Sequence, residues 1–194
     1  MLGAHPIGAA LHLKEFEGRL RGGSGIRVES VTAVTAAFHE SPLAAGLTAD
    51  WLVADWDDVE TWATTVLSFE DGSRAVIAAS FAMLGGIRNC FEVYTGNAVF
   101  RARMTPSDGL MVYSPDPAAF GDEYLHEKAE SRTGWIAASP DEDWVRGYPQ
   151  EMQDFMECIA TDREPLSGLQ LARDVVDVIY ASYESAALGQ TVRL

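Results

Sequence analysis

The sequence has little cysteine and few basic side chains. Its 194 residues include two cysteines, Cys90 and Cys158, which are too few and too far apart for a disulfide framework or a zinc site. Fourteen lysines and arginines stand against twenty-nine aspartates and glutamates, giving a net charge of −15. Such a surface repels phosphate backbones and anionic membranes. We therefore expect neither nucleic acid nor a membrane among the partners.

Long apolar runs are also missing. No stretch reaches the length that a membrane helix needs, and the N-terminus lacks the regions of a secretory signal, so we expect a cytoplasmic location. Hydrophobic residues make up 47% and charged residues 22% of the chain, which is typical of globular proteins. The length favours one domain, residues 1–194, that can bury a core without disulfides or metal.

The motifs of several enzyme classes are missing as well. No G-x-G-x-x-G follows a strand, and the cluster Gly22-Gly23-Ser24-Gly25 follows a helix, which is the wrong context for holding a pyrophosphate. No G-x-S-x-G nucleophile motif occurs. We expect no cofactor-binding and no metal-ligating residues in this chain, and no dinucleotide bound by the chain alone.

What is present is a pattern of helices around strands. Apolar spacing predicts a helix over about 6–21, ended by the glycine cluster, and alternation then predicts a strand from residue 26. Two further strands, at 61–69 and 74–81, flank an Asp71-Gly72 pair. This pair predicts a tight hairpin turn with positive φ at both residues.

The rest of the chain continues this plan. Turn signals, among them 107–109, separate further strands near 89–94, 98–104 and 110–113, and residues 114–146 read as loop with one strand at 135–138. A helix begins at Pro149. Ser167 and Gln170 predict a capping box for a last helix that runs to Gly189 and is followed by an exit strand. The plan is α+β: a large, mostly antiparallel open β-sheet with helices packed on one face.

The other face of this sheet is predicted to be covered too. Residues 76–81 are apolar on both sides, whereas a face left in water usually alternates with polar residues. Two explanations stay open. The sheet could be the interface of a homo-oligomer, a dimer or tetramer, or these residues could form a locally buried central strand in a monomer.

Three segments carry a resemblance to a known family. They are GAHPIGAALHLKEFEG (Gly3 to Gly18), DVETWATTVLSFEDGSRAVI (Asp58 to Ile77), and the run from Gly147 to Val192, in which an aromatic-acidic helix, a Glu-Pro turn, a capped helix and a terminal Gly-x-x-Val follow in order. Together they resemble the C-terminal domain of the Gfo/Idh/MocA oxidoreductases. That family joins an N-terminal Rossmann domain, absent here, to an α+β domain with a large open sheet.

The resemblance implies a function. A sugar, cyclitol or related polyol would bind between the two domains, and NAD or NADP on the Rossmann domain would exchange a hydride with it. The family places a histidine, as base or proton relay, in a D-x-x-x-H pattern at the start of this domain, and His5 matches that histidine. Histidine suits the role because its pKa lies near neutrality. Met1 occupies the aspartate's position, and the family's E-K-P motif is absent.

Each candidate residue has a functional and a structural interpretation. His5 could instead be a frayed terminal residue. His12 lies two helical turns from His5, where it could bind substrate or simply pack. Trp144 and Tyr148 fall in a region that the resemblance places near the substrate cleft. Their rings could pack on a sugar or dock the loop.

Two hypotheses about the whole chain follow. The chain ends in a complete helix and strand, whereas only four residues precede His5. We therefore expect the chain to be one half of a two-domain enzyme. It would then be the substrate-binding and oligomerisation domain of an NAD(P)-dependent dehydrogenase, inactive alone. The alternative is a standalone, non-catalytic module for ligand binding or assembly, derived from that domain. Met1 as a genuine start and the missing aspartate favour this alternative.

Overall fold

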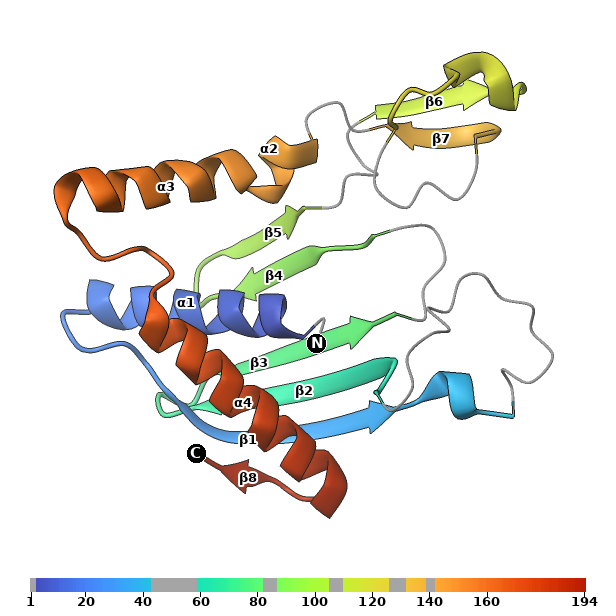
Figure 1. The fold of residues 1–194 in the computed structure, drawn as a ribbon. Helices are drawn as coiled ribbons and strands as arrows, with labels where there is room; N and C mark the ends of the chain where they lie inside the picture. Colours follow the sequence, from blue (N-terminus) through green and yellow to red (C-terminus); the bar gives the residue numbers. More distant parts are fainter. Residues whose placement is uncertain (1–2, 43–58, 82–86, 105–109, 126–131, 139–141) are drawn as a thin grey trace. The chain divides into compact units, whose positions relative to one another are not determined.

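The chain divides into two compact units in the computed structural model (Figure 1). One unit comprises Met1–Met83 and Leu166–Leu194, and the other Leu84–Pro165. The structure describes residues 3–42, 59–81, 87–104, 110–125, 132–138 and 142–194. Met1 and the turn expected at 107–109 lie outside these ranges.

The first unit is a four-stranded antiparallel sheet with two helices. Along the sheet the strands pair in the order β3-β2-β1-β8. The helices are α1 (Ala4–Leu20) and α4 (Leu169–Leu188), the strands are β1 (Val28–Ala36), β2 (Trp62–Phe69), β3 (Arg74–Ser80) and β8 (Val192–Arg193), and a short 3-10 helix covers Phe38–Glu40. The first helix, the hairpin and the exit strand are confirmed.

Both helices pack on one face of this sheet and form its core with it. Alternate positions of the strands point toward α1 and α4, as the period of two in a strand requires. The shared core consists of Ile7, Ala10, Leu11, Ile26, Val31, Leu67, Phe69, Ile77, Leu171, Val178 and Ala181. The predicted α+β class, with antiparallel strands and helices, is confirmed.

The glycine cluster after α1 lets the chain fold back along the end of that helix. A Cβ built on Gly18 would lie 2.2 Å from the carbonyl oxygen of Ser24, a distance that no side chain tolerates. The Ile26 N–H donates to the Lys14 carbonyl at 3.2 Å, and the Gly23 N–H donates to the Gly18 carbonyl at 3.1 Å. The lack of a side chain at Gly18 therefore lets the backbone of the following segment lie directly against the end of α1.

The hairpin turn between β2 and β3 differs from the prediction. Only Gly72 has a positive φ, +87°. The Gly72 N–H donates to the Phe69 carbonyl at 2.9 Å, and the Phe69 N–H donates to the Ser73 carbonyl at 3.0 Å. This is a three-residue loop, in which an ordinary turn precedes one left-handed glycine. The prediction that Asp71 also takes a positive φ was wrong because it assumed a two-residue loop.

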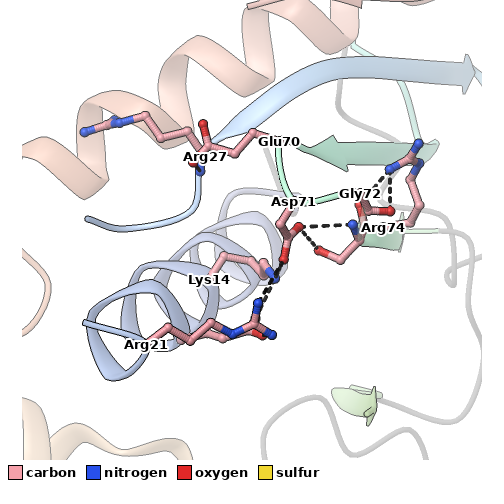
Figure 2. A network of polar contacts seen from close by, with 9 residues as sticks. Lys14, Arg21, Arg27, Glu70, Asp71, Gly72 and Arg74 are labelled. Carbon is pink, nitrogen blue, oxygen red and sulfur yellow. Dashed lines mark hydrogen bonds and ion pairs between the residues drawn. The ribbon is translucent and has the colours of Figure 1, made fainter. Parts of the chain in front are cut away.

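A polar network docks this turn onto α1 (Figure 2). Lys14 donates to the Asp71 carboxylate at 2.8 Å, and the backbone N–H and hydroxyl of Ser73 donate to it at 3.0 and 2.7 Å. The hydrogen bond from Lys14, followed by those from Ser73, holds the pKa of Asp71 well below its usual range. The Lys14 ammonium also lies 5.5 Å from the centre of the Phe69 ring.

Helix α4 begins differently from the prediction and ends as predicted. Its N-cap is Gly168, without a side-chain capping bond, so the capping box was wrong. Gln170 instead donates to Asp174 four residues on, at 2.7 Å, because the helix starts one residue late for Ser167 to cap it. At the other end Gly189 takes φ +65° and donates to the Ser185 carbonyl at 2.9 Å, the expected left-handed cap.

The described residues of the second unit form two antiparallel strand pairs, two α-helices and a 3-10 helix. The strands are β4 (Cys90–Tyr94) with β5 (Val99–Arg103), and β6 (Leu110–Ser114) with β7 (Gly134–Ala138); the helices are α2 (Glu142–Arg146), α3 (Tyr148–Thr161) and a 3-10 helix at Pro117–Phe120. The four strands were predicted. Helix α2 and the 3-10 helix were missed in a region read as loop, because such short helices show too few turns for an apolar period.

The strands of the described residues pair in three groups rather than in one continuous sheet. β3 lies at an edge of the four-stranded group, not at its centre. On the face away from the helices Val34 is 60% exposed and Val76 is 73% exposed. Val66, between them on β2, pairs with Val76. The central-strand explanation for residues 76–81 therefore does not fit the pairing in the first unit.

Candidate functional site

A small cavity opens in the first unit at the start of α1. It has a volume of about 50 Å³, which is room for a few water molecules. The residues that line it come from the helix start, the ends of three strands and α4: Gly3, Ala4, Ile7, Thr35, Glu60, Thr61, Trp62, Ala63, Thr65, Ala79, Ser80, Phe81, Ile179, Ser182 and Tyr183. Hydroxyl groups and one carboxylate thus converge on a partly apolar hollow, the usual make-up of a ligand site.

Thr61 holds the strand ends around this cavity in place. Its N–H donates to the Ala36 carbonyl at 3.0 Å, its carbonyl accepts from the Phe81 N–H at 2.8 Å, and its hydroxyl accepts from the Phe38 N–H at 2.8 Å. The side chain is 3% exposed. One buried threonine therefore joins the ends of β1 and β3 to the short helix that follows β1, so the frame of the cavity is preorganised.

Glu60 and Tyr183 form the titratable pair of the cavity. The Tyr183 hydroxyl donates to both oxygens of the Glu60 carboxylate, at 3.0 and 3.1 Å. Burial, and then the Glu60 carboxylate beside it, raise the pKa of Tyr183 above its ordinary value. The phenol therefore stays protonated at neutral pH and acts as a hydrogen-bond donor rather than as a base.

His5, the predicted catalytic residue, lies in the first turn of α1 and is exposed. Ala4 and Ile7, its neighbours on the helix, face the cavity, whereas His5 does not line it. At about 100° per residue, His5 points to the side of Ala4 and nearly opposite to Ile7. His12 is half-buried on the side of α1 that His5 occupies, since seven residues make almost two full turns. The two histidines therefore share a helix face outside the cavity.

Trp144 and Tyr148 belong to the second unit. Trp144 lies in α2 and is 64% exposed, and Tyr148 begins α3 and is 51% exposed. Each ring leaves a large surface uncovered. Both therefore remain candidates for stacking on a ligand, as the sequence proposed, and neither contributes to the cavity beside α1.

Sequence reasoning missed Glu60 and Tyr183. Glu60 ends a stretch rich in acid and tryptophan, and Tyr183 follows Ser182 in a helix that was predicted from its end signals and its apolar stripe. The signal that could have drawn attention to them is a carboxylate just before a β-strand and a tyrosine off the core stripe of the last helix. Their pairing, 123 residues apart, depends on how α4 crosses the sheet.

The glycine cluster, which lies within the described residues, is not shaped to hold a dinucleotide phosphate. It is packed against α1, where Ser24 and Gly25 approach Gly18 too closely to leave a phosphate cradle. Within the residues described, no group of three or more His, Cys, Asp or Glu side chains could hold a metal ion. None of the helices in that part of the chain is long and apolar enough to cross a membrane.

Comparison with known proteins places the fold. No protein-family model matches the chain, and no curated protein matches it. Solved structures do. GenD2 from gentamicin A biosynthesis, solved in complex with NAD, has a TM-score of 0.65 at 22% identity, over 87% of this chain and 42% of its own. Myo-inositol 2-dehydrogenase from Lactobacillus plantarum has a TM-score of 0.61 at 16% identity, over 96% of this chain and 46% of its own.

A third structure is similar over nearly the whole chain. Aldose-aldose oxidoreductase from Caulobacter crescentus, solved with glycerol, has a TM-score of 0.55 at 20% identity, over 99% of this chain and 46% of its own. The chain has the fold of Gfo/Idh/MocA-type dehydrogenases. It spans less than half the length of each of these three proteins. The fold that the sequence resemblance implied is therefore confirmed.

Proposed function

We propose that this chain, residues 1–194, is the substrate-binding and oligomerisation domain of a Gfo/Idh/MocA family NAD(P)-dependent dehydrogenase that acts on a hydroxyl of a sugar, cyclitol or related polyol. The nicotinamide cofactor, NAD or NADP, is held by a Rossmann domain outside this chain. The domain is cytoplasmic and inactive by itself. His5 is the base or proton relay, and His12, Trp144 and Tyr148 contact the substrate.

One observation supports this proposal most. Nearly the whole chain matches a part of two dehydrogenase structures that is slightly less than half of each one's length. Myo-inositol 2-dehydrogenase and aldose-aldose oxidoreductase act on polyols and sugars by name. His5 supports it further, because an exposed imidazole in a first helical turn is accessible to a substrate held partly by another domain. Removing a hydroxyl proton needs a general base within reach of the substrate.

Oligomerisation through the sheet is part of the proposal. Val34, Val66 and Val76 form an apolar band across three strands on the face that α1 and α4 leave open. Apolar side chains gathered on one open face of a sheet suit an interface between copies of the chain. A second copy of the chain, related by a two-fold axis, would cover it in a dimer or tetramer.

The coding DNA directly upstream of the Met1 codon tests the proposal. We expect it to continue in frame with a strand, a G-x-G-x-x-G and a helix, to contain an E-K-P, and to encode aspartate in place of Met1. A stop codon followed by a proper start at Met1 would contradict the dehydrogenase assignment. The chain would then be a standalone module for ligand binding or assembly.

A further inference from the structure

We infer that the outward face of α1 is the docking surface for the domain that holds the nicotinamide. The inference rests on the proposed function and adds to it the place on this chain where the second domain binds. This surface, the α1 band, consists of His5, Ala9, His12, Leu13, Phe16 and Leu20.

The α1 band lies opposite the side of α1 that packs on the sheet. At about 100° per residue, its six residues fall within an arc of about 100° around the helix. Ile7, Leu11 and Gly18 point to the opposite side, and all three are buried. The band is therefore the side of α1 that lies farthest from the core of the first unit.

The composition of the α1 band is that of a covered surface. Leu13, Phe16 and Leu20 are 36%, 50% and 72% exposed, and the band contains no aspartate, glutamate, lysine or arginine. A helix face in water usually carries charged side chains, and a helix that is apolar on both faces is usually buried. We therefore expect a further layer of protein over α1.

His5 determines what that layer must contain. In the proposed reaction His5 accepts the proton of the substrate hydroxyl, and the carbon that bears this hydroxyl gives its hydride to the oxidised nicotinamide, so a carbonyl forms. Base and nicotinamide must then meet at one substrate group. A second copy of this chain does not bring a nicotinamide there, because its glycine cluster is not shaped to hold a dinucleotide phosphate. The Rossmann domain of the proposed enzyme does.

The matched structures contain enough additional chain for such a domain. This chain covers 42% of GenD2 and 46% of myo-inositol 2-dehydrogenase and of aldose-aldose oxidoreductase, so more than half of each protein lies beyond the matched part. In the proposed enzyme the upstream domain would be joined close to the band, because α1 begins at Ala4. Such a short connection raises the effective concentration of the domain, so an interface of ordinary size keeps it docked.

Thiol labelling tests whether the upstream domain covers the α1 band. Phe16→Cys is made in this chain and in the longer protein encoded by the continuous reading frame. Gln190→Cys is the matched control, because Gln190 is exposed in the turn between α4 and β8. A maleimide is the probe, and mass spectrometry of the peptides separates each new thiol from Cys90 and Cys158.

We expect the thiol of Phe16→Cys to react at least about 10-fold more slowly in the longer protein than in this chain, because a thiol must be exposed to react. The thiol of Gln190→Cys should react at the same rate in both proteins. Leu20→Cys, at the more exposed end of the band, takes the place of Phe16→Cys if that variant does not fold.

A charge on the α1 band tests whether docking matters for turnover. Phe16→Glu should lower kcat/KM of the longer protein for polyol oxidation at least about 10-fold, because docking would bury an unpaired carboxylate and displace the nicotinamide from His5. The melting temperature of this chain alone should change by less than about 2 °C, since Phe16 is half exposed there. Gln190→Glu adds the same charge outside the band and should change neither quantity.

Three outcomes would overturn this inference and leave the proposed function standing. The first is equal labelling of Phe16→Cys in the two proteins. The second is slow labelling in this chain alone, which would mean that something other than the upstream domain covers the band. The third is an unchanged kcat/KM in Phe16→Glu. A stop codon directly upstream of a start at Met1 would instead overturn the inference and the proposed function together.

Discussion

At the scale of single residues, Asp71 shows how one side chain joins a turn to a helix. Its carboxylate accepts from Lys14 on α1 and from Ser73 within the turn, so the β2–β3 hairpin and α1 are held together at this point (Figure 2). Charge-assisted hydrogen bonds of this kind stabilise a fold more than neutral ones do. The pKa of Asp71 is lowered as a result.

Asp71→Asn should therefore lower the free energy of unfolding at neutral pH by about 1–2 kcal/mol. The folded-state pKa lies below the unfolded value of about 3.9, so this stabilisation is present above that value and is lost as pH falls through the folded one. Urea denaturation at several pH values checks it. A difference between wild type and variant that stays constant down to the most acidic pH would contradict the assignment.

The candidate site shows what can be read from residues and what cannot. His5, His12, Trp144 and Tyr148 came from motif and region, and the structure finds them exposed or half-buried on two helices and a helix start. Glu60 and Tyr183 could not be found that way, because neither belongs to a motif. They meet because α4 crosses the sheet beside the start of β2. The position of that crossing is set by how the helix packs on the sheet, which the local sequence does not indicate.

At the scale of elements, Ser185 closes the end of α4 against the sheet. Its side chain is fully buried. The hydroxyl accepts from the Ala33 N–H at 2.9 Å and donates to the Gln190 carbonyl at 2.6 Å. β8 pairs with β1 only at Ser30 and Val31. Beyond that pair, the Ser185 hydroxyl provides the hydrogen-bond acceptor that the N–H of Ala33 on β1 needs.

Ser185→Ala should lower the free energy of unfolding by about 1–3 kcal/mol, because it leaves the Ala33 N–H buried without its acceptor. Ser167→Ala is the control. Ser167 lies before the N-cap of α4 without a capping bond, so its loss should change stability by less than about 0.5 kcal/mol. Guanidinium denaturation measures both. Equal effects of the two substitutions would contradict this account of the helix ends.

Elements with a clear local period were predictable from sequence. The hairpin, α1, α3, α4 and the strands all follow apolar spacing or turn residues. The prediction failed where a shift of one residue changes the result, as in the length of the loop at Gly72 and the position of the N-cap at Gly168. It also failed for a helix as short as α2. How strands group into sheets depends on pairing between distant segments, and a local sequence pattern does not predict that pairing.

At the scale of the whole molecule, the open face of the four-stranded sheet carries the oligomer proposal. Val76→Glu would place an unpaired charge on the apolar band of Val34, Val66 and Val76. We expect self-association to weaken at least about 100-fold, because burying an unpaired charge is costly. Val176→Glu, on the exposed side of α4, is the control and should leave assembly unchanged. Sedimentation velocity decides: a monomeric wild type, or an assembled Val76→Glu variant, would contradict the proposal.

The central claim is that this chain supplies the substrate half of a polyol dehydrogenase. Its most direct test is a turnover assay of the protein encoded by the continuous reading frame, in which reduction of NAD and NADP is followed with a panel of neutral sugars and cyclitols. The account predicts polyol-dependent reduction whose kcat falls by about 10²- to 10⁴-fold in His5→Asn. No reduction with any member of the panel, or a wild-type kcat in His5→Asn, would contradict it.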